Sequence, residues 1–145
     1  MDLKWVNIVV TLSNLFGMIP LMISFQKGNM FEVILIGMTV FASIVMHMSE
    51  MKHKLPGLYF QRYCNEFLWF DRIMAVSSSL YIFYNLVSFH TLLTGRLVTK
   101  IIIGLLFNFL SERVFTGPII FMVLHSVWHC LAYSILADIV YPLIY

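Results

Sequence analysis

Long apolar runs separated by short polar stretches divide the chain into five segments. A helix that crosses a ~30 Å hydrocarbon layer needs roughly 20 mostly apolar residues. Irregular backbone is excluded from that layer because its amide groups would lack hydrogen-bond partners. The pattern therefore predicts an all-α, polytopic transmembrane helix bundle of about five spans, at residues 5–25, 31–48, 66–89, 97–110 and 117–141.

Polar residues mark the predicted connections. Gln26-Lys27-Gly28-Asn29 ends the first segment, and a polar connection covers residues 49–64. Glu112-Arg113 reads as a turn at the membrane interface, and Gly117-Pro118 is typical of the first turn of a helix. The first apolar segment is too long for the core of a signal peptide and is expected to be retained as a span. Without a linker or repeat, residues 1–145 are expected to form a single transmembrane domain.

Composition supports a membrane solvent. Of the 145 residues, 61% are hydrophobic and 11% are charged, and the mean hydropathy is +0.90. A soluble domain carries roughly a quarter charged residues, so this chain has too few polar side chains to cover a soluble surface. Membrane lipids are therefore its expected surroundings. The net charge of +2 without a long Lys/Arg run argues against nucleic-acid binding. Two cysteines give no disulfide framework.

Basic residues predict the orientation of the bundle. With five spans, the N-terminus, the 49–64 connection and the turn near Arg113 share one side of the membrane. That side and the neighbouring residues carry Lys4, Lys52, Lys54, Arg62, Arg72 and Arg113, against Lys27, Arg96 and Lys100 opposite. Because basic residues are enriched on the inner side, the N-terminus is expected on the cytoplasmic or matrix side. An endomembrane, the plasma membrane and the mitochondrial inner membrane all remain open.

Four ionisable residues lie inside predicted spans, where each costs several kcal/mol unless it is paired, bound to metal or hydrated. His47 ends the second span, Asp71 lies early in the third, and His125 and His129 lie early in the last. If the chain crosses five times, all four lie in the same half of the membrane. We therefore expect them to converge.

Helical spacing places these residues on common faces. His125 and His129 are four residues apart, so their imidazoles project from one side of a helix. Ser43 and His47 repeat this spacing in the second span. A polar stripe along the third span, which is expected to face the interior, consists of Asp71, Ser78 and Asn85.

The three histidines suit two kinds of chemistry. Three imidazoles with an open fourth position form a common catalytic zinc site, in which the metal activates water and polarises a carbonyl. A carboxylate such as Asp71 orients an imidazole or moves a proton. Buried polar side chains also join helices through hydrogen bonds worth ~0.6–2 kcal/mol. Convergence at one depth favours a metal site at His47, His125 and His129.

The motifs also resemble a known family. Ser43-x-x-x-His47, Asp71 and His125-Ser-Val-Trp-His129-Cys130 are similar to the signature of the CREST superfamily, which includes alkaline ceramidases and adiponectin receptors. The likeness is closest to the myomaker-type branch and covers about residues 14–90 and 117–136. The resemblance implies Zn²⁺ held by the three histidines, with Ser43 and Asp71 as catalytic residues in the hydrolysis of a lipid amide or ester.

The superfamily usually has seven helices, whereas five are expected here. Two middle spans are missing from the wall that encloses the lipid cavity, and a partner protein or a second copy would close the gap. Two functions therefore stand side by side. One is a zinc-dependent lipid hydrolase, with Asp71 as general acid/base or orienting group and Ser43 as a donor to the oxyanion. The other is a non-catalytic membrane-remodelling protein or subunit, for example of a respiratory-chain complex, with a structural metal.

Overall fold

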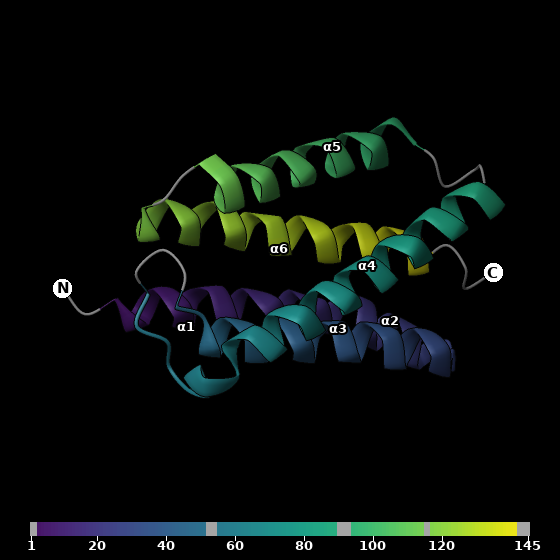
Figure 1. Ribbon diagram of the computed structural model, residues 1–145. Helices are drawn as coiled ribbons and strands as arrows, with labels where there is room; N and C mark the ends of the chain where they lie inside the picture. Colours follow the sequence, from purple (N-terminus) through teal and green to yellow (C-terminus); the bar gives the residue numbers. More distant parts are fainter. Residues whose placement is uncertain (1–2, 52–54, 90–93, 115–116, 142–145) are drawn as a thin grey trace.

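The computed structural model describes residues 3–51, 55–89, 94–114 and 117–141, and the described residues form helices and short connections with no strand. The helices of these residues form five rods, and Figure 1 shows how they are arranged. The first is a continuous rod made of α1 (Lys4–Ser13), a 3-10 turn η1 (Asn14–Gly17) and α2 (Met18–Gln26). The others are α3 (Met30–Ser49), α4 (Cys64–Ser88), α5 (Gly95–Phe109) with its π-helical extension η5 (Leu110–Val114), and α6 (Pro118–Val140). The predicted all-α bundle is confirmed.

Among the described residues, three helices are long and apolar enough to cross a membrane: Lys4–Gln26, Met30–Ser49 and Pro118–Val140. Helix α4, with 25 residues, is long enough to cross a membrane, but it carries the polar stripe of Asp71, Ser78 and Asn85. Helix α5 has 15 residues, fewer than the roughly 20 that span a bilayer, and η5 lengthens it. Three helices of this length and apolar composition are consistent with an integral membrane protein. Its orientation stays a prediction, and Lys52 and Lys54, two of the basic residues counted for it, lie outside the described residues.

Helix α6 lies between the first rod and α5. It packs against α1, η1 and α2 on one side and against α5 on another, while α3 packs against α1, α2 and α4. Helix α4 crosses α3 obliquely (Figure 1). Close packing around η1 depends on Gly17, where an added Cβ atom would lie 2.3 Å from Val40 Cγ2 and 2.8 Å from Tyr133 Cε1. The turn η1 therefore packs directly against α3 and α6.

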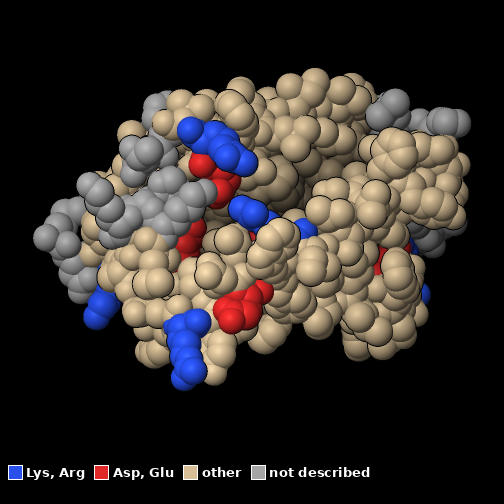
Figure 2. Space-filling model, viewed as in Figure 1, with Lys and Arg blue, Asp and Glu red and all other residues tan. Residues whose placement is uncertain are grey.

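The outer surface is apolar and the interior holds polar groups, as a lipid solvent requires. In Figure 2 most of the visible face lacks charged residues, which gather mainly toward the end where the chain begins. Within α4, which is described in full, the buried residues are Ser78 and Asn85. Ser78 Oγ lies 2.8 Å from Thr39 Oγ1 on α3. The predicted polar stripe thus faces the interior.

The connection between α3 and α4 folds back onto α3. The backbone N–H groups of Leu58 and Tyr59 donate to the Met48 carbonyl at 2.7 and 2.9 Å. Leu55 is 3% exposed and packs with Val6 and Phe121. A segment expected to be polar therefore has an apolar anchor, since burial of Leu55 between α1 and α6 removes its side chain from water.

Candidate metal centre

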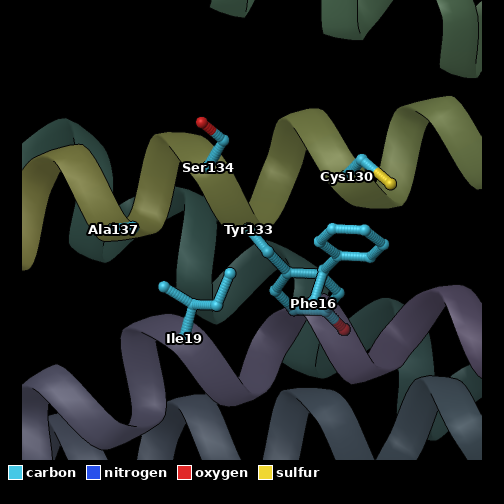
Figure 3. Close-up of a pocket in the computed structure, with 6 residues that line it drawn as sticks. All are labelled: Phe16, Ile19, Cys130, Tyr133, Ser134 and Ala137. Carbon is cyan, nitrogen blue, oxygen red and sulfur yellow. The ribbon is translucent and has the colours of Figure 1, made fainter.

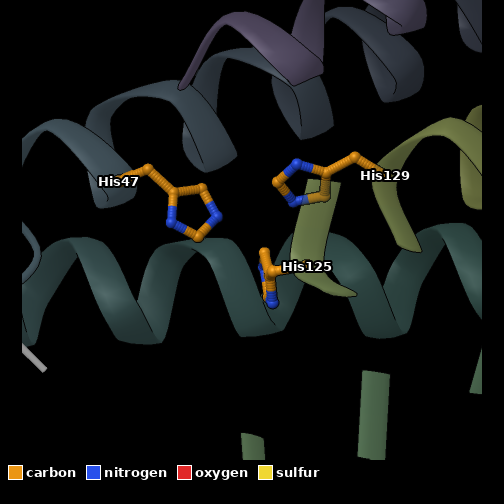
Figure 4. A group of neighbouring side chains, drawn as sticks. All are labelled: His47, His125 and His129. Atoms are coloured by element: carbon orange, nitrogen blue, oxygen red, sulfur yellow. The ribbon is translucent and has the colours of Figure 1, made fainter. Parts of the chain in front are cut away.

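Three histidines form a compact buried cluster, which we call the histidine cluster: His47, His125 and His129. His47 lies in the last turn of α3, and the other two lie four residues apart on α6. Their ring centroids are 4.7 to 5.0 Å apart, and each offers one ligand atom within 4.8 Å of the others. Figure 4 shows the three rings turned toward one another. The predicted convergence is confirmed, and the cluster is close enough to hold a metal ion.

In each ring, Nδ1 lies within hydrogen-bond distance of a side-chain oxygen atom. His47 Nδ1 lies 2.8 Å from Glu50 Oε2, and His129 Nδ1 lies 2.7 Å from Ser13 Oγ. His125 Nδ1 lies 3.2 Å from Ser111 Oγ and 3.5 Å from Glu112 Oε1. With Nδ1 engaged in each case, Nε2 is the nitrogen that remains for the centre of the cluster. Metal-binding histidines commonly have such outer hydrogen bonds.

The two other predicted residues also lie at the cluster. Ser43 is one turn before His47 on α3, and its Oγ lies 3.5 Å from His129 Nε2. Asp71, half-buried on α4, is close enough to interact with the Ser43 hydroxyl group and with the His47 imidazole. The structure therefore brings all five predicted site residues together from three helices.

Negative charge surrounds the histidines. The carboxyl groups of Glu50 and Glu112 lie 2.8 Å from His47 Nδ1 and 3.5 Å from His125 Nδ1, respectively, and Asp71 lies close by on α4. Glu50 is 1% exposed, and its Oε1 atom has no hydrogen-bond partner in the structure. A buried carboxylate is stable only if it is paired or faces a cation. The surroundings of the cluster thus favour a bound cation.

Sequence patterns missed three residues at this site: Ser13 on α1, and Ser111 and Glu112 on η5. We expected Glu112 in an interfacial turn, but the π-helical turn brings it and Ser111 to the same imidazole. Turns of this kind often occur at functional sites. The available signal was the presence of serines in otherwise apolar helices, which is weak because such serines usually bond their own helix.

An open apolar groove lies beside the cluster, between α6 and the η1–α2 part of the first rod (Figure 3). Its volume is about 280 Å³, and it is lined by Phe16, Ile19, Cys130, Tyr133, Ser134 and Ala137. The histidines are not among these residues. Tyr133 separates the two regions, since its ring centroid is 6.3 Å from that of His129 and its hydroxyl group donates to Asn14 Oδ1 at 2.8 Å.

No family model, no curated protein and no solved structure matches this chain. The residues of the site and their geometry therefore carry the evidence for its function. The donor set fits a transition metal, because imidazole nitrogens suit zinc, copper, iron and nickel. Three protein ligands leave at least one coordination position for another molecule, which is the arrangement of catalytic zinc sites.

Proposed function

We propose that this protein holds Zn²⁺ at His47, His125 and His129 and hydrolyses an amide or ester bond of a membrane lipid, as the resemblance to the CREST superfamily implies. The observation that carries the proposal is the convergence of three buried imidazoles beside Asp71 and Ser43.

The location of the site favours a lipid substrate. His47 lies in the last turn of α3, so the cluster is near one end of the bundle. The ester and amide bonds of membrane lipids lie in the interfacial region just outside the hydrocarbon core. Half-buried Asp71 lies on α4, the polar third rod. The site therefore lies near the depth at which lipid ester and amide carbonyls occur.

The proposed roles follow from the contacts. Zinc, when bound, supplies Lewis acidity for the polarisation of a carbonyl and the activation of water. Asp71 accepts a proton from the attacking water and returns it to the leaving group, as a general acid/base within reach of the metal ligands. Ser43 donates a hydrogen bond to the oxygen that becomes negative in the transition state.

Asp71→Asn separates chemistry from metal binding. The variant is expected to fold and keep its zinc, but to lose roughly 10²–10⁴-fold in turnover, the usual contribution of a general acid/base. Hydrolysis of ceramide and phospholipids is measured in nanodiscs by mass spectrometry, with zinc content measured in parallel. Asp138→Asn is the matched control, because Asp138 pairs with Lys100 through Oδ2 on the outer part of α6. Zinc-loaded wild type that cleaves none of these lipids would rule out the hydrolase.

A second candidate is a non-catalytic subunit in which the metal joins α3 to α6. The arrangement of α5 favours it. Helix α5 packs against α6 and its own extension η5, and the groove on the flank of α6 is open. A partner helix would cover this flank. The subunit proposal predicts that native membranes yield the chain in a stable complex with other proteins and that Asp71→Asn changes neither assembly nor stability. Recovery of a single active chain would exclude it.

A further inference from the structure

The hydrogen bonds around the histidine cluster determine where each ring carries its proton. A neutral imidazole has one N–H donor and one acceptor nitrogen, and its partner at one nitrogen decides which tautomer is present. Around the cluster, each Nδ1 atom faces an oxygen from a different element: α1, η5 or the end of α3. Whether each oxygen donates or accepts can be worked out from its other bonds.

Ser13 can only accept from His129. Its hydroxyl group has one proton, which it donates to the Val10 carbonyl at 2.6 Å. The 2.7 Å contact with His129 Nδ1 must then have the imidazole as donor, because two acceptors would repel each other at this distance. The proton of His129 is therefore on Nδ1, and its lone pair is on Nε2.

Ser111 repeats this arrangement at His125. It donates its proton to the Asn108 carbonyl at 2.8 Å and lies 3.2 Å from His125 Nδ1. The Glu112 carboxylate, 3.5 Å from the same nitrogen, is also an acceptor. At His47 the partner is the Glu50 carboxylate, which accepts as well. All three imidazoles are thus in the same tautomer.

We propose that Ser13, Ser111 and Glu50 are positioning residues that hold the three histidines as Nδ1–H tautomers, so that Nε2 of each ring already carries the lone pair that a metal ion would take. This inference rests on the proposed function for the identity of the ligand, but the tautomers themselves belong to the metal-free protein. Such preparation removes the need to move protons or turn rings on binding, and outer hydrogen bonds of this kind also raise the basicity of the ligand.

Helix α1 has a defined part in this arrangement although it carries no metal ligand. Its Ser13 accepts a hydrogen bond from His129. Asn7, six residues before Ser13, donates a hydrogen bond from Nδ2 to the Glu50 backbone carbonyl at 3.0 Å. Asn7 is 1% exposed, so this contact is shielded from competing groups. The first rod therefore supports histidines on both α3 and α6.

Nitrogen-15 NMR of metal-free protein with labelled histidines measures the tautomers directly, because protonated and unprotonated ring nitrogens have well-separated shifts. At about pH 8, where an ordinary imidazole is neutral, wild type should show Nδ1–H at all three positions. Ser13→Ala should convert His129 to a tautomer mixture and leave His47 unchanged. Ser13→Thr, which keeps the hydroxyl group, should restore the wild-type signal.

Ser49→Ala is the matched control. Ser49 is a fully buried serine that donates to the carbonyl three residues earlier, Met46, at 2.8 Å, like Ser13 and Ser111. Its hydroxyl group has no histidine contact among the hydrogen bonds of the described residues. Its removal should therefore leave the tautomers unchanged. An Nε2–H tautomer at His129 in wild type, or an unchanged His129 signal in Ser13→Ala, would overturn the inference.

Zinc affinity is the second readout, measured by competition with a chelator. Ser13→Ala, Ser111→Ala and Glu50→Gln should each weaken binding about 10–100-fold, the usual effect of a change in the outer shell, while Ser49→Ala should have no effect. Glu50→Gln should keep the His47 tautomer, because its amide oxygen still accepts. Wild type that shows the predicted tautomers and binds no zinc would overturn the proposed function alone. Wild-type affinity in all three variants would overturn the positioning roles.

Discussion

A buried polar cluster lies at each end of α3. The two clusters differ in whether their own donors and acceptors balance. At the N-terminal end is the Lys27 cluster, formed by Lys27, Glu32, Tyr81 and the Val140 carbonyl. Lys27 Nζ donates to both Glu32 carboxylate oxygens at 3.2 and 3.1 Å and to Val140 O at 2.9 Å. Tyr81 donates its hydroxyl proton to Glu32 Oε1. The histidine cluster lies at the other end, roughly 22 Å away at 1.5 Å per helical residue.

The Lys27 cluster is complete in itself. An ammonium group has three donors, and these meet three acceptors, while the positive and negative charges cancel. The histidine cluster instead brings together three groups of the same kind, each held from outside through Nδ1. Burial of polar groups is therefore poor evidence for a functional site on its own. Donors and acceptors that balance indicate a structural role, whereas three like groups close enough to share an ion are compatible with a ligand site.

The largest expected effect is the loss of metal in His125→Ala. Wild type should contain about one zinc ion per chain, and the variant close to none, because two imidazoles alone form an incomplete site. Elemental analysis of protein purified without added chelator measures the ratio. Lys27→Met is the control from the other cluster and should keep its zinc. Equal zinc in wild type and His125→Ala would place the metal elsewhere.

The next effect is on stability and concerns the Lys27 cluster. Lys27→Met leaves the Glu32 charge buried without its cation, so the free energy of unfolding should fall by about 3–5 kcal/mol. Lys27→Met combined with Glu32→Gln should recover much of that loss, since both charges are then gone. Unfolding by SDS titration in mixed micelles measures both. A double variant as unstable as the single one would show that the charge pair is not the cause.

A smaller effect should appear when zinc is added to metal-free protein. A ligand at 100 times its dissociation constant stabilises the folded state by about 2.7 kcal/mol, so the midpoint of thermal unfolding should rise. The rise should persist in Lys27→Met and vanish in His125→Ala. If both variants respond alike, zinc stabilises the bundle through some other group.

The smallest effect is expected for Tyr81→Phe. It removes the donor to Glu32 Oε1 while Lys27 still pairs with the carboxylate, so the loss should be about 1–3 kcal/mol. The SDS titration used for Lys27→Met detects this difference, and zinc content should not change. A loss as large as that of Lys27→Met would mean that the tyrosine, and not the lysine, keeps the carboxylate buried.

The sequence predicted the bundle and the centre of the site for clear physical reasons. Long apolar runs have one stable form in lipid, so the positions of the rods follow from composition. The spacing of His125 and His129 fixes their common face. His47 lies next to a polar connection, which fixed its depth and led to the expectation that the three meet.

The residues that surround the histidines could not be predicted from the sequence, because their positions depend on how the helices pack. Ser13 looks like any serine in an apolar helix until α1 is placed against α6. Glu112 reaches His125 from the π-helical η5, a turn that short-range patterns do not encode. Lys27 was expected in a connection. Its side chain is 8% exposed and pairs with the Glu32 side chain, which is 1% exposed. This burial depends on the end of α6, where the Val140 carbonyl also accepts from Lys27.

The positions of the ligands along the chain set an order for the maturation of this protein. His47 is on the second long helix, whereas His125 and His129 are on the last one. While the ribosome is still synthesising the middle of the chain, the nascent protein has one of the three imidazoles and no pocket. Under the proposed function, zinc insertion would thus be a late event that follows the synthesis of α6, and a chain stalled before that helix would lack a complete site for the ion.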